Sequence, residues 1–231
     1  MRTLIAIAMI LAAATEGCSN DSSQCSPTGS ACNDGLCFNG AADGVCDQDG
    51  KCNTQPSNIG TCTVFLTQSS YAPGIGGLAG ADQACQDAAR QAGLKGTFKA
   101  WLSDSRQSAA QRLTHSVVPY VDLKGRAIAN DWSDLTGGSV HRAITVDQNS
   151  YDWDADADHC SFPWEVFTQV WTGTRADGSA EGPFCNDWTS DDEGTTGAVG
   201  MYCDTSSEWT CRADPAAESC GLFSNFYCFQ Q

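Results

Sequence analysis

The alternation of apolar and polar residues after residue 60 predicts short strands and helices. Thr63 to Thr67 form a β-branched and aromatic run typical of a strand, and Thr97 to Leu102 form a second. From Ala81 to Ala92, small apolar residues recur at spacings of three and four, and Gly93 follows. This predicts a helix that ends at the glycine. The glycine-rich stretch from Tyr71 to Gly80 predicts a loop.

Two further elements are expected in the same region. Ser103 or Ser105 could cap a helix that extends through Leu113, because a serine oxygen accepts hydrogen bonds from the free amides of a first turn. Leu222 to Phe229 predicts the last strand. Short strands, two helices and long loops together predict an α+β domain over residues 61–231.

The first residues are typical of an export signal over residues 1–17. A basic start precedes an apolar stretch from Leu4 to Ala14, which is shorter than the roughly 20 residues that span a bilayer. Gly17-Cys18 resembles a bacterial lipobox, so we expect Cys18 to be acylated in an exported lipoprotein that is anchored to the outer membrane. The alternative is ordinary cleavage and secretion, with Cys18 in a disulfide.

A low-complexity segment over residues 18–60 separates the signal from the domain. It holds one aromatic residue, Phe38, together with glycine, aspartate and serine. Such a composition cannot offset its ordering entropy without cross-links. We therefore predict a tether that carries a small disulfide-linked knot. Its further cysteines are Cys25, Cys32, Cys37, Cys46 and Cys52.

Cysteine content and charge exclude several classes of function. Fourteen cysteines in an exported chain indicate a disulfide framework. The sequence contains no CxxC pair, so a structural zinc site is not expected. The net charge of −16 repels phosphate backbones, so no nucleic-acid partner is expected. For the same reason, we expect contact with a membrane only through a lipid anchor.

Five segments in order resemble the endostatin domain that ends certain vertebrate basement-membrane collagens (collagenase NC10/endostatin type). These segments are ADQACQDAARQAGLKGTFKAWL at 81–102, VPYVDLK at 118–124, VWTG at 170–173, CNDW at 185–188 and FYCF at 226–229. The chain is also similar to bacterial secreted lipoproteins of a domain family of unknown function, which share the FKAWLSDS and YCFQ signatures. The resemblance implies a C-type-lectin-like fold whose last strand pairs with its first.

The resemblance also implies two nested disulfides, Cys85–Cys228 and Cys185–Cys220. Cys203 and Cys211 have no counterpart in that pattern, and their short separation predicts a local Cys203–Cys211 bridge. Cys62 and Cys160 are then left to pair with each other or with the tether. If Cys18 is acylated, an odd number of cysteines remains, so one would be free or intermolecular.

Two properties of endostatins are not expected here. Vertebrate endostatins bind heparin through arginine patches, which this acidic chain lacks, so heparin binding is not expected. Endostatin's zinc is held by histidines near the start of the domain and by an aspartate that matches Asp147. This chain has no histidine before His115, so the resemblance implies that the zinc site is lost.

Alternating carboxylates form a candidate calcium loop at Asp152, Asp154, Asp156 and Asp158. Such side chains can converge on a hard cation where the chain loops. An EF-hand would need glycine and glutamate where this chain has Ala157 and Pro163. A solvated acidic loop is therefore the alternative.

Two tryptophans in this acidic region are candidate ligand contacts. Trp153 and Trp164 could stack on a sugar or pack on a partner protein, whereas Trp171 and Trp188 match core positions of the family. No catalytic motif surrounds the three histidines His115, His141 and His159, so no enzyme activity is expected. The sequence thus predicts a non-catalytic module that binds an extracellular protein or glycan. The alternatives are a structural envelope protein without a ligand and a secreted hydrolase.

Overall fold

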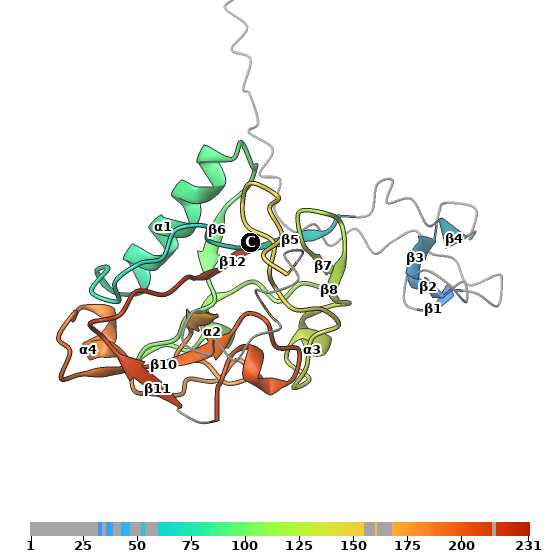
Figure 1. The fold of residues 1–231 in the computed structure, drawn as a ribbon. Helices are drawn as coiled ribbons and strands as arrows, with labels where there is room; N and C mark the ends of the chain where they lie inside the picture. Colours follow the sequence, from blue (N-terminus) through green and yellow to red (C-terminus); the bar gives the residue numbers. More distant parts are fainter. Residues whose placement is uncertain are drawn as a thin grey trace, which may run out of the picture.

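The computed structural model describes residues 60–154, 160, 168–213 and 216–231, together with four short strands before residue 54 (Figure 1). The early strands form one antiparallel sheet in the order β1-β2-β3-β4. They are β1 (Cys32–Asn33), β2 (Leu36–Phe38), β3 (Asp43–Cys46) and β4 (Cys52–Asn53). None of the described helices is both long and apolar enough to cross a bilayer.

A five-stranded sheet forms the centre of the domain, in the order β6-β12-β5-β7-β8. Its strands are β5 (Cys62–Leu66), β6 (Phe98–Ala100), β7 (Tyr120–Val121), β8 (Ala127–Ala129) and β12 (Tyr227–Gln230). The last strand pairs antiparallel with the first strand of the domain, where Cys228 faces Phe65. The expected meeting of the two ends of the domain is therefore present, and β5 and β7 supply the one parallel pair of this sheet.

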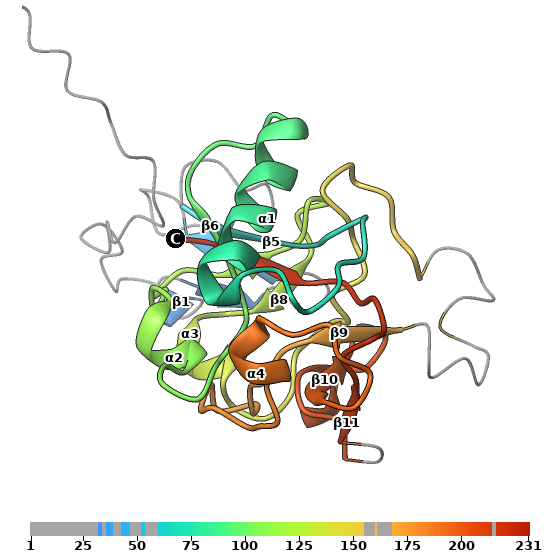
Figure 2. The ribbon, with the colours of Figure 1, turned by 90° about the vertical axis from the view of Figure 1, so that its left-hand side faces the viewer.

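A second, three-stranded sheet has the order β11-β10-β9 and lies at the lower side of the molecule in both ribbon views (Figure 2). Its strands are β9 (Gln169–Trp171), β10 (Thr196–Met201) and β11 (Ala217–Ser219). The helical segments are α1 (Gly77–Gln91), α2 (Ala109–Arg112), α3 (Trp132–Leu135), α4 (Cys185–Trp188) and the 3₁₀ turn η1 (Ser207–Trp209). The domain is thus α+β with mainly antiparallel strands and one long helix.

Aromatic side chains fill the core. Trp101 contacts Trp209 and Phe229 at ring-centre distances of 5.1 and 5.4 Å. Trp171 and Trp188 are fully buried, as expected from the sequence. Full burial of rings this large makes the hydrophobic effect the main stabilising contribution of the domain.

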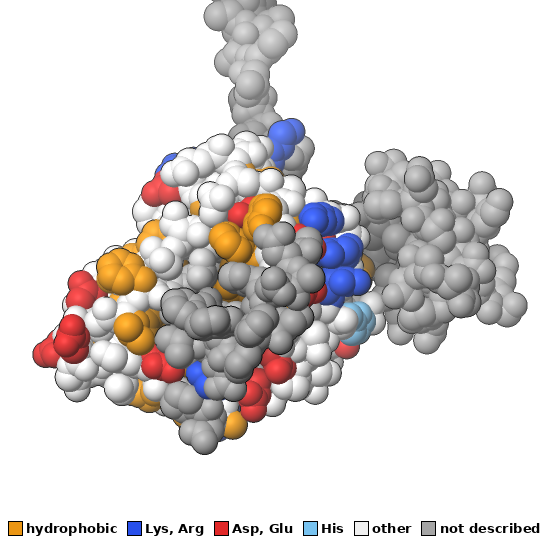
Figure 3. Space-filling view, in the orientation of Figure 1, with side chains coloured by type: hydrophobic (Ala, Val, Ile, Leu, Met, Phe, Trp, Pro, Cys, Tyr) orange, Lys and Arg blue, Asp and Glu red, His pale blue; other side chains and the backbone are white. Residues whose placement is uncertain are grey.

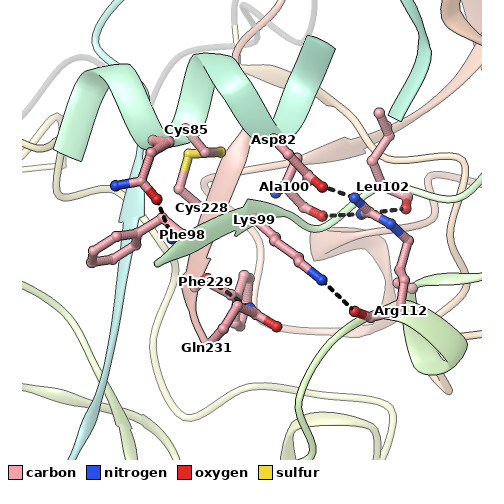
Figure 4. Close-up of polar contacts among 12 residues, drawn as sticks. Asp82, Cys85, Phe98, Lys99, Ala100, Leu102, Arg112, Cys228, Phe229 and Gln231 are labelled. Atoms are coloured by element: carbon pink, nitrogen blue, oxygen red, sulfur yellow. Dashed lines mark hydrogen bonds and ion pairs between the residues drawn. A yellow bond between two sulfur atoms is a disulfide. The ribbon is translucent and has the colours of Figure 1, made fainter. Parts of the chain in front are cut away.

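Side chains of α1 and α2 cover the free edge of strand β6 (Figure 4). The Phe98 N–H donates to Gln86 Oε1 at 2.9 Å, and the Ala100 N–H donates to Asp82 Oδ1 at 3.0 Å. The buried Arg112 guanidinium donates to the Ala100 C=O at 2.7 Å and to Asp82 at 2.5 Å. Side chains therefore occupy three outward backbone groups of β6, which protects this edge from pairing with another strand.

Helix α1 begins at Gly77, inside the stretch predicted to be a loop. Ile75 and Leu78 pack against the core, which holds this segment in place despite its glycines. A Cβ atom on Gly80 would lie 1.9 Å from the Ile75 carbonyl oxygen. The glycine therefore permits a close approach between the loop and the first helical turn, which the sequence pattern alone does not distinguish from a loop.

Helix α2 is shorter than predicted and has a different cap. It begins after Ser108, whose side chain accepts from the Gln111 N–H in a capping box. The predicted cap at Ser103 or Ser105 is wrong, because the chain continues without helical structure until Ser108. Ser103 is buried, and its Oγ still accepts from the Ala109 N–H at 2.8 Å, so it binds an amide of the first turn without being the N-cap.

Both disulfides that the resemblance implies are present. Cys85–Cys228 joins α1 to the last strand across a sequence separation of 143 residues, and Cys185–Cys220 joins α4 to the end of β11. In the chain-entropy account, a loop of the first size stabilises a fold by about 5 kcal/mol. The first bridge therefore clamps the long helix onto the central sheet.

The predicted Cys203–Cys211 bridge is wrong. Cys203 bonds Cys160, and Cys211 is a free thiol. The chain between Cys203 and Cys211 forms η1 around the fully buried Trp209 rather than a hairpin. Cys62 is disulfide-bonded, and its partner lies outside the described domain because Cys160 is taken.

The segment α4 is a left-handed turn. All four of its residues have positive φ, from 48° at Cys185 to 60° at Trp188. Left-handed backbone costs about 1 to 2 kcal/mol per residue, so surrounding contacts must hold it. They include the Cys185–Cys220 bridge, the Trp188 indole N–H donating to the Ser103 C=O at 2.6 Å, and the Asp187 carboxylate accepting from Ser105 at 2.9 and 3.0 Å.

Candidate binding surface

Three loops meet at the end of the central sheet where β5 finishes. They comprise residues 67–71, 147–153 and 221–225, and we call them the three-loop surface. Tyr71 and Ser224 exchange backbone hydrogen bonds of 2.8 and 3.1 Å, which join the first loop to the third. The Gln68 N–H donates to Gln148 Oε1 at 2.8 Å, which joins the first loop to the second. The arrangement is therefore fixed by hydrogen bonds and by the sheet beneath it.

Asp147 shapes the second loop from within. It is fully buried, and its Oδ1 accepts the N–H groups of Asn149 at 2.8 Å and Tyr151 at 3.1 Å. A carboxylate that accepts two amides in this way replaces the hydrogen bonds that a regular element would provide. The turn ends with the Tyr151 ring directed outward, 43% exposed.

Two loops of the three-loop surface carry exposed apolar side chains. Of the four exposed large hydrophobic residues in the described part of the chain, Tyr151, Leu222 and Phe223 belong to it, and Phe223 is 67% exposed. The sequence analysis did not identify these three residues. The available signal was a large apolar residue directly after turn-forming residues: Tyr151 follows Asn149-Ser150, and Leu222 with Phe223 follows Gly221. Large apolar groups exposed together are a recurrent property of protein interaction sites.

Trp153, one of the two predicted ligand contacts, packs mainly against the core. It is partly buried among core residues, its backbone N–H donates to the Thr145 C=O, and its ring meets Tyr151 edge-to-face at 5.1 Å. Trp153 therefore supports the exposed Tyr151 ring from below. The second predicted contact, Trp164, lies outside the described residues.

In the described part of the predicted calcium loop, Asp152 forms ion pairs with basic side chains of the protein. Asp152 is 6% exposed, and its Oδ2 lies 2.8 Å from Arg126 and 3.5 Å from Lys124. Burial alone would raise the pKa of Asp152, but the Thr145 hydroxyl and the Arg126 charge outweigh burial and lower the pKa. A calcium ion at Asp152 would compete with two cationic side chains. Asp154 is exposed, and Asp156 and Asp158 lie outside the described residues.

Asp147 matches the aspartate that holds zinc in endostatins, and its Oδ2 is buried without a hydrogen-bond partner. Across the described residues, no three His, Cys, Asp or Glu side chains gather in a set that could hold a metal ion. Among these residues, the contacts of Asp147 are those that organise the second loop.

The two described histidines are engaged away from any nucleophile. His115 stacks on Trp132 at 4.0 Å, and its Nε2 contacts the Ala110 carbonyl at 2.7 Å. His141 Nε2 lies 2.9 Å from Asp134 Oδ2, and both side chains are more than 30% exposed. A histidine beside a carboxylate supports hydrolysis only if it also contacts a nucleophile. Neither histidine contacts a serine hydroxyl or a cysteine thiol in the described structure. His159 lies outside it.

A separate open cavity of about 440 Å³ lies between α3, the turn at Arg175–Asp177 and η1. Cys211 and Ser207 line it on one side. Burial and the nearby Glu181 carboxylate raise the pKa of the Cys211 thiol. The thiol therefore stays protonated at neutral pH, which limits its reactivity.

Charges are unevenly distributed over the face in Figure 3. Lys and Arg side chains gather at one side, whereas Asp and Glu side chains are spread along the opposite and lower edges. With 28 acidic and 12 basic residues, most of the surface repels anions.

Comparison with known proteins places these features in a family. The sequence profile described as "Collagenase NC10 and Endostatin" matches residues 64–207. The human collagen alpha-1(XVIII) chain is 30% identical over 133 residues, which cover 56% of this chain and 8% of the collagen chain. This chain therefore corresponds to a small part of that relative. Because the profile covers more than half of the sequence, the chain belongs to the collagenase NC10 and endostatin family and has its C-type-lectin-like fold.

Proposed function

We propose that this protein is an exported, lipid-anchored binding module that engages an extracellular protein or glycan through the three-loop surface. The observation that carries this proposal is the exposure of Tyr151, Leu222 and Phe223 on loops that hydrogen bonds hold together. Binding sites commonly lie on loops that a rigid scaffold positions. A structural protein without a ligand has no need for such exposed apolar side chains.

The direction of β5 suits display away from a membrane. The strand begins at Cys62, next to the N-terminal segment, and ends at Leu66, next to the three-loop surface. At about 3.3 Å per residue, roughly 13 Å separates the two ends. A lipid on Cys18 would therefore attach at the end of the domain opposite to the binding surface.

The cysteine count supports acylation of Cys18. Within the domain, three disulfides are formed, Cys62 is bonded to a cysteine outside the domain, and Cys211 is free. Six cysteines precede the domain, and one of them pairs with Cys62, so an odd number remains. If the remaining N-terminal cysteines pair only with one another, this odd number leaves one of them for another modification. Cys18, which follows Gly17 after the apolar stretch, is the residue suited to that role.

A glycan and matrix-protein array tests the binding proposal. The soluble chain is applied as wild type, as Tyr151→Ala with Phe223→Ser, and as the control Val117→Ser, whose exposed side chain lies outside the three-loop surface. We expect ligands that the wild type and the control retain and the double variant loses. A chelator arm tests the calcium prediction for Asp152, Asp154, Asp156 and Asp158. Equal signals from all three proteins would contradict the proposed surface.

A further inference from the structure

The outer strand of the three-stranded sheet has a free edge. The Cys220 N–H donates to the Thr195 C=O at 3.0 Å, and hydrogen-bonded pairs alternate along antiparallel strands. The next hydrogen-bonded pair along β11 is therefore Glu218 with Gly197. Ala217 and Ser219 belong to the non-bonded pairs, so their backbone N–H and C=O groups point away from β10. The Ser219 C=O accepts from the Leu222 N–H at 3.1 Å. On that side, the Ala217 N–H and C=O and the Ser219 N–H have no partner among the described residues.

This edge differs from the covered edge of β6. Gln86, Asp82 and Arg112 bind the outward backbone groups of β6, whereas no described side chain does so for β11. In both ribbon views, β11 lies at the outer side of its sheet (Figures 1 and 2). An uncovered edge of this kind can pair with an added strand.

Apolar and acidic groups flank the free edge of β11. Leu222 and Phe223, 40% and 67% exposed, follow the strand directly after a tight turn. Asp191, Asp192 and Glu193 are exposed, and the Glu193 side chain lies against Gly221. The basic residue Arg212 lies 3.6 Å from Glu218 and offsets that carboxylate, so the charges of Asp191, Asp192 and Glu193 remain.

We propose that β11 receives an extended, basic segment of a partner protein as an added strand, with apolar side chains of that segment packed on Leu222 and Phe223. This inference rests on the proposed binding function and specifies its partner as a polypeptide. Main-chain hydrogen bonds would fix the register, and the carboxylates would select lysine and arginine. A second copy of this chain fits poorly, because it would bring like charges together.

Three synthetic peptides test the added strand by titration against the soluble chain. One alternates lysine with valine, the second has proline in place of every other valine, and the third alternates glutamate with valine. Proline removes the backbone donors that a ladder needs, and glutamate reverses the charge. We expect the lysine peptide to bind, with an affinity that falls as salt rises, and the other two to bind at least about tenfold more weakly.

Matched protein variants locate the site. Ala217→Pro removes an outward N–H at a position where an edge strand tolerates proline, and Phe223→Ser removes the apolar contact. Both should weaken the lysine peptide at least about tenfold, and Val117→Ser should not. If Ala217→Pro fails to fold, the proline peptide still tests the ladder.

Several outcomes would overturn the added strand. These are no binding of the lysine peptide, equal binding of the lysine and proline peptides, or self-association of the chain that Phe223→Ser abolishes. If one of these outcomes occurs while the array still yields a ligand that the single variant Tyr151→Ala loses, the three-loop function stands without the added strand. If the array signals of the wild type and the double variant are equal, the proposed function is contradicted instead.

Discussion

At the residue scale, buried charges connect the loops to the sheets. Asp152 joins the base of the acidic region to the β7–β8 turn through Arg126 and Lys124, and Asp82 joins α1 to β6 through Arg112. In both places a carboxylate also accepts a backbone amide. Substitution to asparagine or alanine can therefore separate the contribution of the charge to stability from that of the hydrogen bonds.

Acid should weaken the contacts of Asp152. Its folded-state pKa is lowered, so these contacts stabilise the protein above the unfolded carboxyl's pKa of about 3.9 and are lost as the pH falls further. We expect Asp152→Asn to lower stability at pH 7 and to reduce its decline below about pH 4. Urea unfolding of both proteins at the two pH values measures this. Parallel pH curves would contradict the role of Asp152.

Removal of Asp82 should cost more than the loss of one hydrogen bond. Asp82→Ala leaves Arg112, 5% exposed, without its carboxylate, and should destabilise the fold by about 3 kcal/mol. Asp82→Asn keeps an oxygen acceptor for the Ala100 N–H and should cost less. Denaturant midpoints compare the two. Equal losses would show that the charge on Asp82 contributes little.

At the element scale, the left-handed turn α4 is the most unusual feature of the fold. Its four residues include Asn186 and Asp187, two residue types that tolerate positive φ, but also Cys185 and Trp188, which adopt it less readily. The turn places Trp188 in the core and Asp187 against Ser105. Its conformation is therefore maintained by packing and by the disulfide.

Substitutions at Asn186 test that conformation. Asn186→Gly and Asn186→Val both remove the side-chain bond to Thr189, so their difference isolates the backbone. The valine variant should be less stable than the glycine variant by about 1 to 2 kcal/mol, because a β-branched residue resists φ of 54°. Thermal unfolding measures the difference. Equal stabilities would show that the turn is right-handed or mobile in solution.

The elements that the sequence predicted share strong local patterns. The strand at Thr63–Thr67 was predicted from a β-branched and aromatic run, the helix that ends before Gly93 from its periodicity, and two disulfides from the resemblance. The missed features depend on contacts between distant segments. The start of α1 depends on Ile75 and Leu78 packing against the core, and Cys203 bonds Cys160 at a sequence separation of 43. No local pattern distinguishes exposed Phe223 from buried Phe226.

At the scale of the whole molecule, the chain enters β5 at Cys62 and leaves it at Leu66, next to the three-loop surface. This arrangement suits a domain presented on a surface. Exposed apolar groups and the free edge of β11 adjoin each other through residues 219–223, so one partner could use both.

The anchor is tested by detergent phase partition. We expect the wild-type protein in the detergent phase and Cys18→Ser in the aqueous phase, because two acyl chains or more are needed for stable anchoring. Labelling with a radioactive fatty acid provides an independent check. Recovery of a mature wild-type protein that begins before Cys18 in the aqueous phase would contradict acylation.

Hydrogen–deuterium exchange of the soluble chain, free and bound to its tightest array ligand, tests most directly whether binding occurs at the three-loop surface. The account predicts slower exchange on binding in residues 67–71, 147–153 and 221–225, with no change around the cavity at Arg175–Asp177. Protection confined to that cavity, or to the surface around Val117, would contradict it.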